Sequence, residues 1–153
     1  MAFLGRSIVI VFALILAAMA AGVATAIGLL GLDLHTAGPD PVGHVVFWGT
    51  AIVASGVTVV VGFLPVFIAV VLAEAFSVRS FVIHAAAGAV ILLFSYYSAG
   101  FASTYEESID RAPPRISREA EIAAAVGVVF GMTYWLIAGR NAGRWRERRA
   151  PVE

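Results

Sequence analysis

Cysteine and lysine are absent from this chain of 153 residues, and charged residues of any kind are few. Without cysteine there is no disulfide, no thiolate metal site and no thiol nucleophile. Charged residues make up only 13% of the chain, about half of the share that soluble domains carry. This composition excludes a water-soluble fold of this size.

Catalytic motifs are absent as well. The sequence has no glycine-rich phosphate loop, no nucleophile elbow and no pair of histidines at helical spacing. No stretch interleaves basic and aromatic residues in the manner of a nucleic-acid-binding surface, so no nucleic-acid partner is expected. The sequence therefore predicts a protein that is not an enzyme and that has no cofactor.

What the chain has in abundance is long apolar stretches, since hydrophobic residues make up 61% of it. A helix needs about 20 apolar residues to cross a hydrocarbon core about 30 Å thick. Four stretches reach about that length and together occupy most of the chain. The sequence predicts an all-α integral membrane protein, a single four-helix transmembrane bundle over residues 1–153. The expected spans are 8–30, 45–73, 81–102 and 120–138.

The first stretch also has features of a secretory signal, because Arg6 precedes an apolar run that contains small residues around Thr25. The apolar part of a signal peptide is about 7–15 residues long. Ile8–Leu30 is longer than that, which favours an uncleaved span over a cleaved signal.

The distribution of arginine predicts the orientation, because positive residues near span ends stay in the cytoplasm. With four spans, both termini and the second loop share one side of the membrane. We therefore expect both termini in the cytoplasm and the chain in the inner (plasma) membrane of a bacterial cell, as its small size and short arginine-rich tail suggest. That side holds Arg6, Arg79, Arg140, Arg144, Arg146, Arg148 and Arg149, and the other side holds Arg111, Arg115 and Arg118.

The second span is longer than a bilayer requires, since Val45–Ala73 would extend about 43 Å as a straight helix. Pro65 has no N–H and clashes with the carbonyl of Val61. Together with Gly62 it predicts a kink. The kink is either a hinge or gate, or a fit of the helix around its neighbours, and proline alone is a sufficient cause for the second interpretation.

Small residues recur at four-residue spacing in the spans, which places them on one helix face and lets helix backbones approach closely in lipid. Gly22 belongs to such a set in the first span, and Gly127 and Gly131 form the sharpest one in the fourth. These glycines predict helix packing within one chain or, alternatively, between copies of the chain, because the motif does not identify its partner.

Ionisable residues are missing from the middle of every span, which argues against ion-coupled antiport. Glu74, Arg79 and His84 lie around the turn between the second and third spans. They are interpreted either as a small proton or ligand site in the inner leaflet or, preferably, as an interfacial salt bridge that pins the turn.

Two other polar groups lie outside the spans. Asp33, His35, Asp40 and His44 are weak candidates for zinc or copper ligands, but their spacing matches no metal motif, so no metal is predicted. Haem ligation by His44 and His84 is excluded because they lie at opposite faces of the bilayer. Basic residues of the C-terminal tail are expected to bind anionic lipid headgroups: Arg140, Arg144, Arg146, Arg148 and Arg149.

These observations predict a small polytopic membrane protein with a non-catalytic accessory or scaffold role. The alternative is a small oligomeric channel or transporter, in which the small-residue faces and the bend at Pro65 frame a pathway. The expected partners are the lipid bilayer and either further copies of the chain or another membrane protein.

Overall fold

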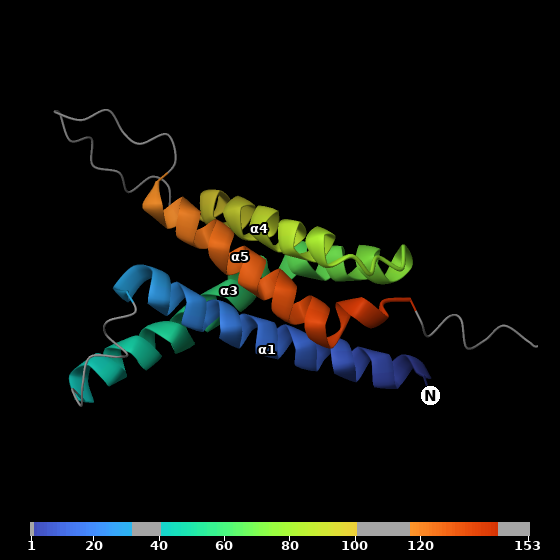
Figure 1. The fold of residues 1–153 in the computed structure, drawn as a ribbon, viewed down its shortest axis with the longest axis horizontal. Coiled ribbons are helices and arrows are strands. Elements are labelled where there is room, and N and C mark those ends of the chain that lie inside the picture. The colour runs from blue at the N-terminus through green and yellow to red at the C-terminus, as the bar shows by residue number, and fades with distance from the viewer. Residues whose placement is uncertain (1, 32–40, 101–116, 144–153) are drawn as a thin grey trace, which may run out of the picture.

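The computed structural model describes residues 2–31, 41–100 and 117–143, and these ranges are all-helical (Figure 1). Each of the four α-helices is long and apolar enough to cross a membrane. The prediction of an all-α fold with four such helices is confirmed. The elements are α1 (Ala2–Leu30), α3 (Pro41–Ala75), α4 (Phe81–Ser98), α5 (Arg118–Ile137) and the short 3-10 helix η2 (Gly139–Asn141).

The helices begin and end a few residues away from the expected limits. α1 begins at Ala2, so Arg6 lies inside it rather than ahead of it. α4 ends at Ser98, four residues before the expected limit at position 102, which itself lies outside the described residues. α5 begins after Ser117, whose hydroxyl oxygen accepts a hydrogen bond from the backbone N–H of Ala120 at 3.2 Å. This cap satisfies one of the N–H groups that a helix start leaves unpaired.

The helices are neighbours in the order α3, α1, α5, α4, and α3 meets α4 much less closely than the other adjacent pairs meet. Ala2, η2 and the turn between α3 and α4 all lie at one end of the bundle, on the right in Figure 1. We call this the terminal end, and the other the opposite end. The weak contact between α3 and α4 leaves the bundle open along one side.

Glycines set the closest helix contacts. A Cβ on Gly127 of α5 would lie 2.6 Å from the carbonyl carbon of Gly88 on α4, and one on Gly131 would overlap the carbonyl oxygen of His84. A Cβ on Gly22 of α1 would lie 2.9 Å from the backbone nitrogen of Ser55 on α3. In each pair one backbone lies directly against another, and only glycine permits that approach.

α3 changes direction along its length: its teal first part and its green last part run at different angles in Figure 1. Pro65 lies inside this helix and offers no N–H to the carbonyl of Val61. Gly62 is buried, and a Cβ there would lie 3.9 Å from Leu92 of α4. The last part of α3 therefore lies near α4, whereas the first part diverges from it.

α3 ends in a tight turn with one unusual residue. Ser77 has a φ of +52°, the left-handed conformation that favours glycine. The N–H of Val78 donates to the carbonyl of Ala73 at 2.9 Å, which closes the six-residue loop of a Schellman ending with Ser77 at its left-handed position.

Replacing Ser77 by glycine should stabilise the protein by about 1 kcal/mol, because glycine adopts this φ without the Cβ penalty. The measurement is the free energy of unfolding in detergent micelles titrated with SDS. Ser80→Gly is the matched control, since Ser80 has a φ of −72° and should gain nothing. A loss of stability in Ser77→Gly would instead show that contact between Ser77 and Gly143 outweighs the backbone strain.

Candidate functional site

The first candidate site is a cluster of polar side chains at the terminal end, centred on an ion pair between α1 and α3. The guanidinium of Arg6 pairs with the carboxylate of Glu74, and its Nε donates to Oε1 at 2.9 Å. The two side chains are only 12% and 13% exposed. Arg6 also donates to the carbonyl of Ala138 at 2.8 Å, and Glu74 Oε2 accepts from the N–H of Gly143 at 3.0 Å. One ion pair thus ties α1, α3 and the segment after α5 together.

Arg79 extends this cluster into the turn between α3 and α4. Its Nε donates to the carbonyl of Ala142 at 2.9 Å. The indole N–H of Trp135, near the end of α5, donates to the carbonyl of Arg79 at 2.8 Å. The ring of Phe81 lies edge-on to Trp135 with centroids 5.3 Å apart. The turn is therefore attached to α5 by both polar and aromatic contacts.

His84, the third predicted member, is buried in the first turn of α4 with 8% of its surface exposed. Its Nδ1 lies 2.8 Å from the carbonyl of Ser80. A carbonyl only accepts, so Nδ1 carries the proton and Nε2 is left as an acceptor in the neutral ring. Nε2 has no partner among the described residues and faces Gly139, where an added Cβ would lie only 2.9 Å away. His84 stacks on Tyr134 and fills space between α4 and α5.

The structure places Glu74, Arg79 and His84 at the same end of the bundle, but the ion-pair partner of Glu74 is Arg6. Sequence analysis missed this residue because it treated Arg6 as a flanking charge outside the first span. The signal that could have found it was a lone arginine beside one apolar run and a lone glutamate beside another on the same predicted side. A charged side chain at that depth is costly when it is unpaired, so two opposite charges there are expected to form a pair.

The remaining predicted site residues are only partly described. His44 is exposed near the start of α3, and Arg140 is exposed in η2. No three of the described His, Asp and Glu residues lie close enough together to hold a metal ion. Outside the described residues lie Asp33, His35, Asp40, Arg144, Arg146, Arg148 and Arg149.

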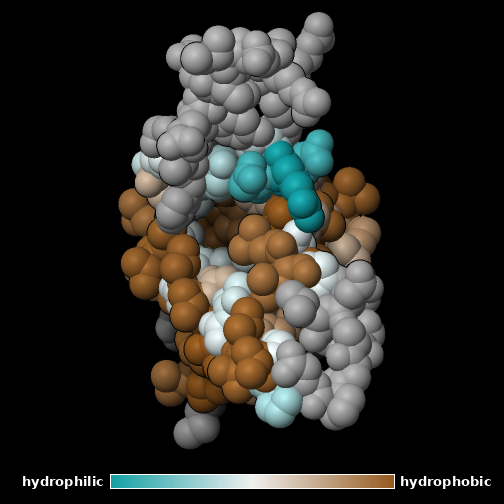
Figure 2. All heavy atoms as spheres, turned by 90° about the vertical axis from the view of Figure 1, so that its left-hand side faces the viewer, coloured by the Kyte–Doolittle hydropathy of each residue, from teal (hydrophilic) through white to brown (hydrophobic). Residues whose placement is uncertain are grey.

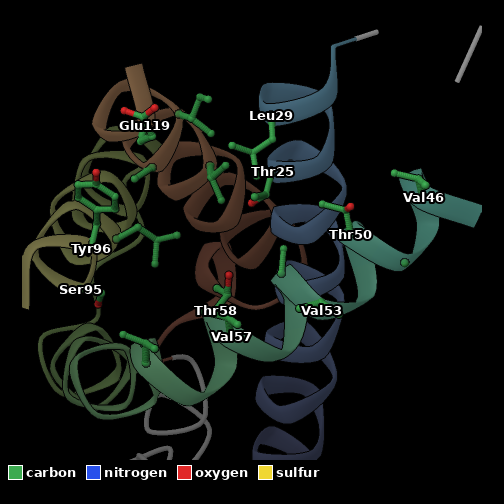
Figure 3. A pocket seen from close by; sticks show the side chains of 18 of the residues that line it. Thr25, Leu29, Val46, Thr50, Val53, Val57, Thr58, Ser95, Tyr96 and Glu119 are labelled. Carbon is green, nitrogen blue, oxygen red and sulfur yellow. The ribbon is translucent and has the colours of Figure 1, made fainter. Parts of the chain in front are cut away.

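The second candidate site is a groove of about 1120 Å³ on the open side of the bundle, toward the opposite end. The first part of α3, from Val45 to Gly62, forms one wall, and α4 forms the other. α1 and α5 form its floor. Figure 3 shows Glu119 and Leu29 at one end of this lateral groove and Thr58 nearer its other end. Sequence analysis missed the groove because its existence depends on where α3 diverges from α4.

The groove is mostly apolar, with a few polar groups in its lining. Hydroxyl groups come from three helices, and the one carboxylate in the lining belongs to Glu119. Ser95 is buried, and its Oγ has no hydrogen-bond partner among the described residues. A smaller cavity of about 240 Å³ lies nearer the terminal end, between α3, α4 and α5. The polar lining residues of the groove are Thr25, Thr50, Thr58, Ser95, Tyr96 and Glu119.

Figure 2 shows hydrophobic residues over much of the described surface at the opposite end, with the most hydrophilic residues gathered in its upper part. The lateral groove can hold an apolar molecule beside the carboxylate of Glu119. The polar cluster at the terminal end can hold the segment that follows α5. Comparisons with protein-family models, with curated proteins and with solved structures find no match for this chain.

Proposed function

We propose that this chain is a multi-pass protein of the bacterial inner (plasma) membrane with both termini in the cytoplasm. The observation that carries the proposal is the exposure of large apolar side chains on all four helices. Ile52 and Val60 of α3, for example, are 70% and 77% exposed. Apolar surface on this scale is unfavourable in water, and lipid is the solvent in which it costs nothing.

The arginines at the terminal end support a cytoplasmic location for both termini. This end gathers Arg6, Arg79 and Arg140, whereas Arg118 starts α5 at the opposite end with Glu119 beside it. Since positive residues near span ends are retained in the cytoplasm, the terminal end is the cytoplasmic one in this proposal.

Reporter fusions test this topology. A fusion of alkaline phosphatase, which is active only outside the cytoplasm, should be inactive after residue 143 and active after residue 100. A cytoplasmic fluorescent reporter should give the reverse pattern. Activity of the phosphatase at residue 143 would contradict an even number of spans with cytoplasmic ends.

Within the membrane, we propose a non-catalytic accessory or scaffold role. The polar side chains of the terminal end support it, because they are engaged in holding chain segments together. Glu74 binds the N–H of Gly143 and Arg79 binds the carbonyl of Ala142, so the cluster fixes the start of the basic tail at one face. Purification in mild detergent followed by mass spectrometry of associated proteins tests this role. Recovery of the chain without any stoichiometric partner would count against it.

The alternative, a small oligomeric channel or transporter, is favoured by two glycines of α3. A Cβ on Gly49 or Gly56 would meet no atom within 4 Å, so packing inside the chain gives no reason for glycine there. Glycine costs about 1 kcal/mol relative to alanine inside a helix. Contact with another copy would supply a reason. Solute flux into proteoliposomes that contain the purified protein tests this alternative, and impermeable vesicles would reject it.

A further inference from the structure

We propose that the lateral groove binds one phospholipid whose headgroup ends in a primary ammonium, with the ammonium on Glu119 and the acyl chains along α3 and α5. This inference rests on membrane embedding, and it adds a ligand that the scaffold role does not require. It begins from the shape of the groove, which is open at the side of the bundle and about 1120 Å³ in volume.

The depth of the groove fits a lipid of one leaflet rather than a helix that crosses the membrane. Along α5 its lining runs from Glu119 to Val126, a rise of about 10 Å at 1.5 Å per residue. The α3 wall from Val45 to Gly62 is longer, about 25 Å of helix, because α3 crosses the groove obliquely (Figure 3). One leaflet of the hydrocarbon core is about 15 Å deep. Below that depth the last part of α3 lies near α4, because Gly62, Leu92 and Val126 are all buried where the lining ends. A membrane-spanning helix would have no groove to continue into at this level.

The charge of the groove selects the headgroup. Glu119 is exposed, lines the mouth of the groove and has no hydrogen-bond or ion-pair partner among the described residues. Arg118 precedes it, is exposed, and reaches the carbonyl of Gly28 of α1 at 3.4 Å. The carboxylate of Glu119 at the mouth complements a headgroup that carries an ammonium. The guanidinium of Arg118 lies outside the groove lining, one residue earlier in α5, and is the nearest described positive charge in the sequence for the phosphate. An anionic headgroup without an amine would leave Glu119 unmatched.

Hydroxyl groups line the groove farther from the mouth than Glu119. Figure 3 shows Tyr96 and Thr25 deeper in the groove than Glu119, with Ser95 and Thr58 deeper still. The Ser95 hydroxyl is buried and unpartnered among the described residues, which is costly in an apolar environment. The ester carbonyls of a phospholipid lie just below its headgroup and accept hydrogen bonds. The carboxylate of Glu119 and the hydroxyls of Thr25 and Tyr96 follow the order of headgroup and ester groups in a lipid, whereas Thr58 lies at the level of the acyl chains.

The test is native mass spectrometry of the purified full chain in detergent with added palmitoyl-oleoyl phosphatidylethanolamine or phosphatidylglycerol. Glu119→Gln should lower the fraction of protein carrying one phosphatidylethanolamine about fivefold, the loss expected for one exposed charge pair. It should not lower phosphatidylglycerol binding, because that headgroup has no amine to pair with Glu119 and loses a like charge in the variant. Glu121→Gln is the matched control, because Glu121 is also exposed in the first turn of α5 but does not line the groove. Equal phosphatidylethanolamine binding in wild type and Glu119→Gln would overturn the proposal.

A second measurement uses the unmodified protein, so it does not depend on a variant that folds. A phosphatidylethanolamine with a photoreactive group on one acyl chain should crosslink to groove residues such as Val57 and Ala123 in wild-type protein. Crosslinks confined to other surfaces would reject the site even if the reporter fusions establish the membrane topology. Failure of the fusions would instead overturn the membrane proposal itself.

Discussion

Replacing Glu74 by alanine is expected to destabilise the protein by about 3 kcal/mol or more, because it leaves the guanidinium of Arg6 buried without its counter-charge. The two side chains are 12% and 13% exposed, so solvent screens the pair only weakly. The N–H of Gly143 loses its acceptor in the same variant. The free energy of unfolding in mixed micelles measures the global effect, and faster hydrogen exchange at the Gly143 amide reports the release of the C-terminal segment.

A double-mutant cycle separates the ion pair from its surroundings. Arg6→Met combined with Glu74→Leu should recover most of the stability lost in either single variant, since an apolar pair of similar size carries no desolvation cost. Arg118→Met is the matched control for removal of an arginine, because this side chain is exposed and its hydrogen bond is long. If Glu74→Ala stays within about 0.5 kcal/mol of the wild type, the pair does not hold the terminal end together.

The second large effect is expected at the contact between α4 and α5. Gly127→Val should destabilise the bundle by about 3 kcal/mol, the upper part of the range for overpacked cores. A Cβ at this position would lie 2.7 Å from the Cα of Ala89 and closer still to the carbonyl of Gly88, and backbone atoms cannot rotate away. The two helices must therefore separate along the contact.

Gly56→Val is the matched control for Gly127→Val, because a Cβ at Gly56 meets no atom within 4 Å. This variant should leave the monomer stable, and any effect on the size of the particle would point to contact between copies. Unfolding in micelles and near-ultraviolet circular dichroism, to which Tyr134 and Trp135 of the same helix contribute, follow both variants. Equal stability of the two variants would mean that α4 and α5 are not held by backbone contact.

The expected helices came close to the observed ones because helix length in apolar stretches is a local property. Runs of apolar residues fix how many helices can form, and capping groups such as Ser117 fix where α5 starts. The start of α1 differed because the expected span was placed on the apolar run after Arg6, whereas a paired arginine can lie within the helix. The left-handed residue Ser77 carries no clear sequence signal, since glycine is the usual residue at that position.

Residue type and spacing alone predicted four long apolar helices, and they show that most arginines lie near the chain termini and in the link between the second and third helices. The pairing of Glu74 with a residue 68 positions away and the groove between α3 and α4 could be found only in the three-dimensional arrangement of the helices. The reason is geometric. Which side chains contact each other depends on the tilt and bend of α3 and on where helix backbones approach at glycines. Small residues on one helix face do not identify the helix that packs against them.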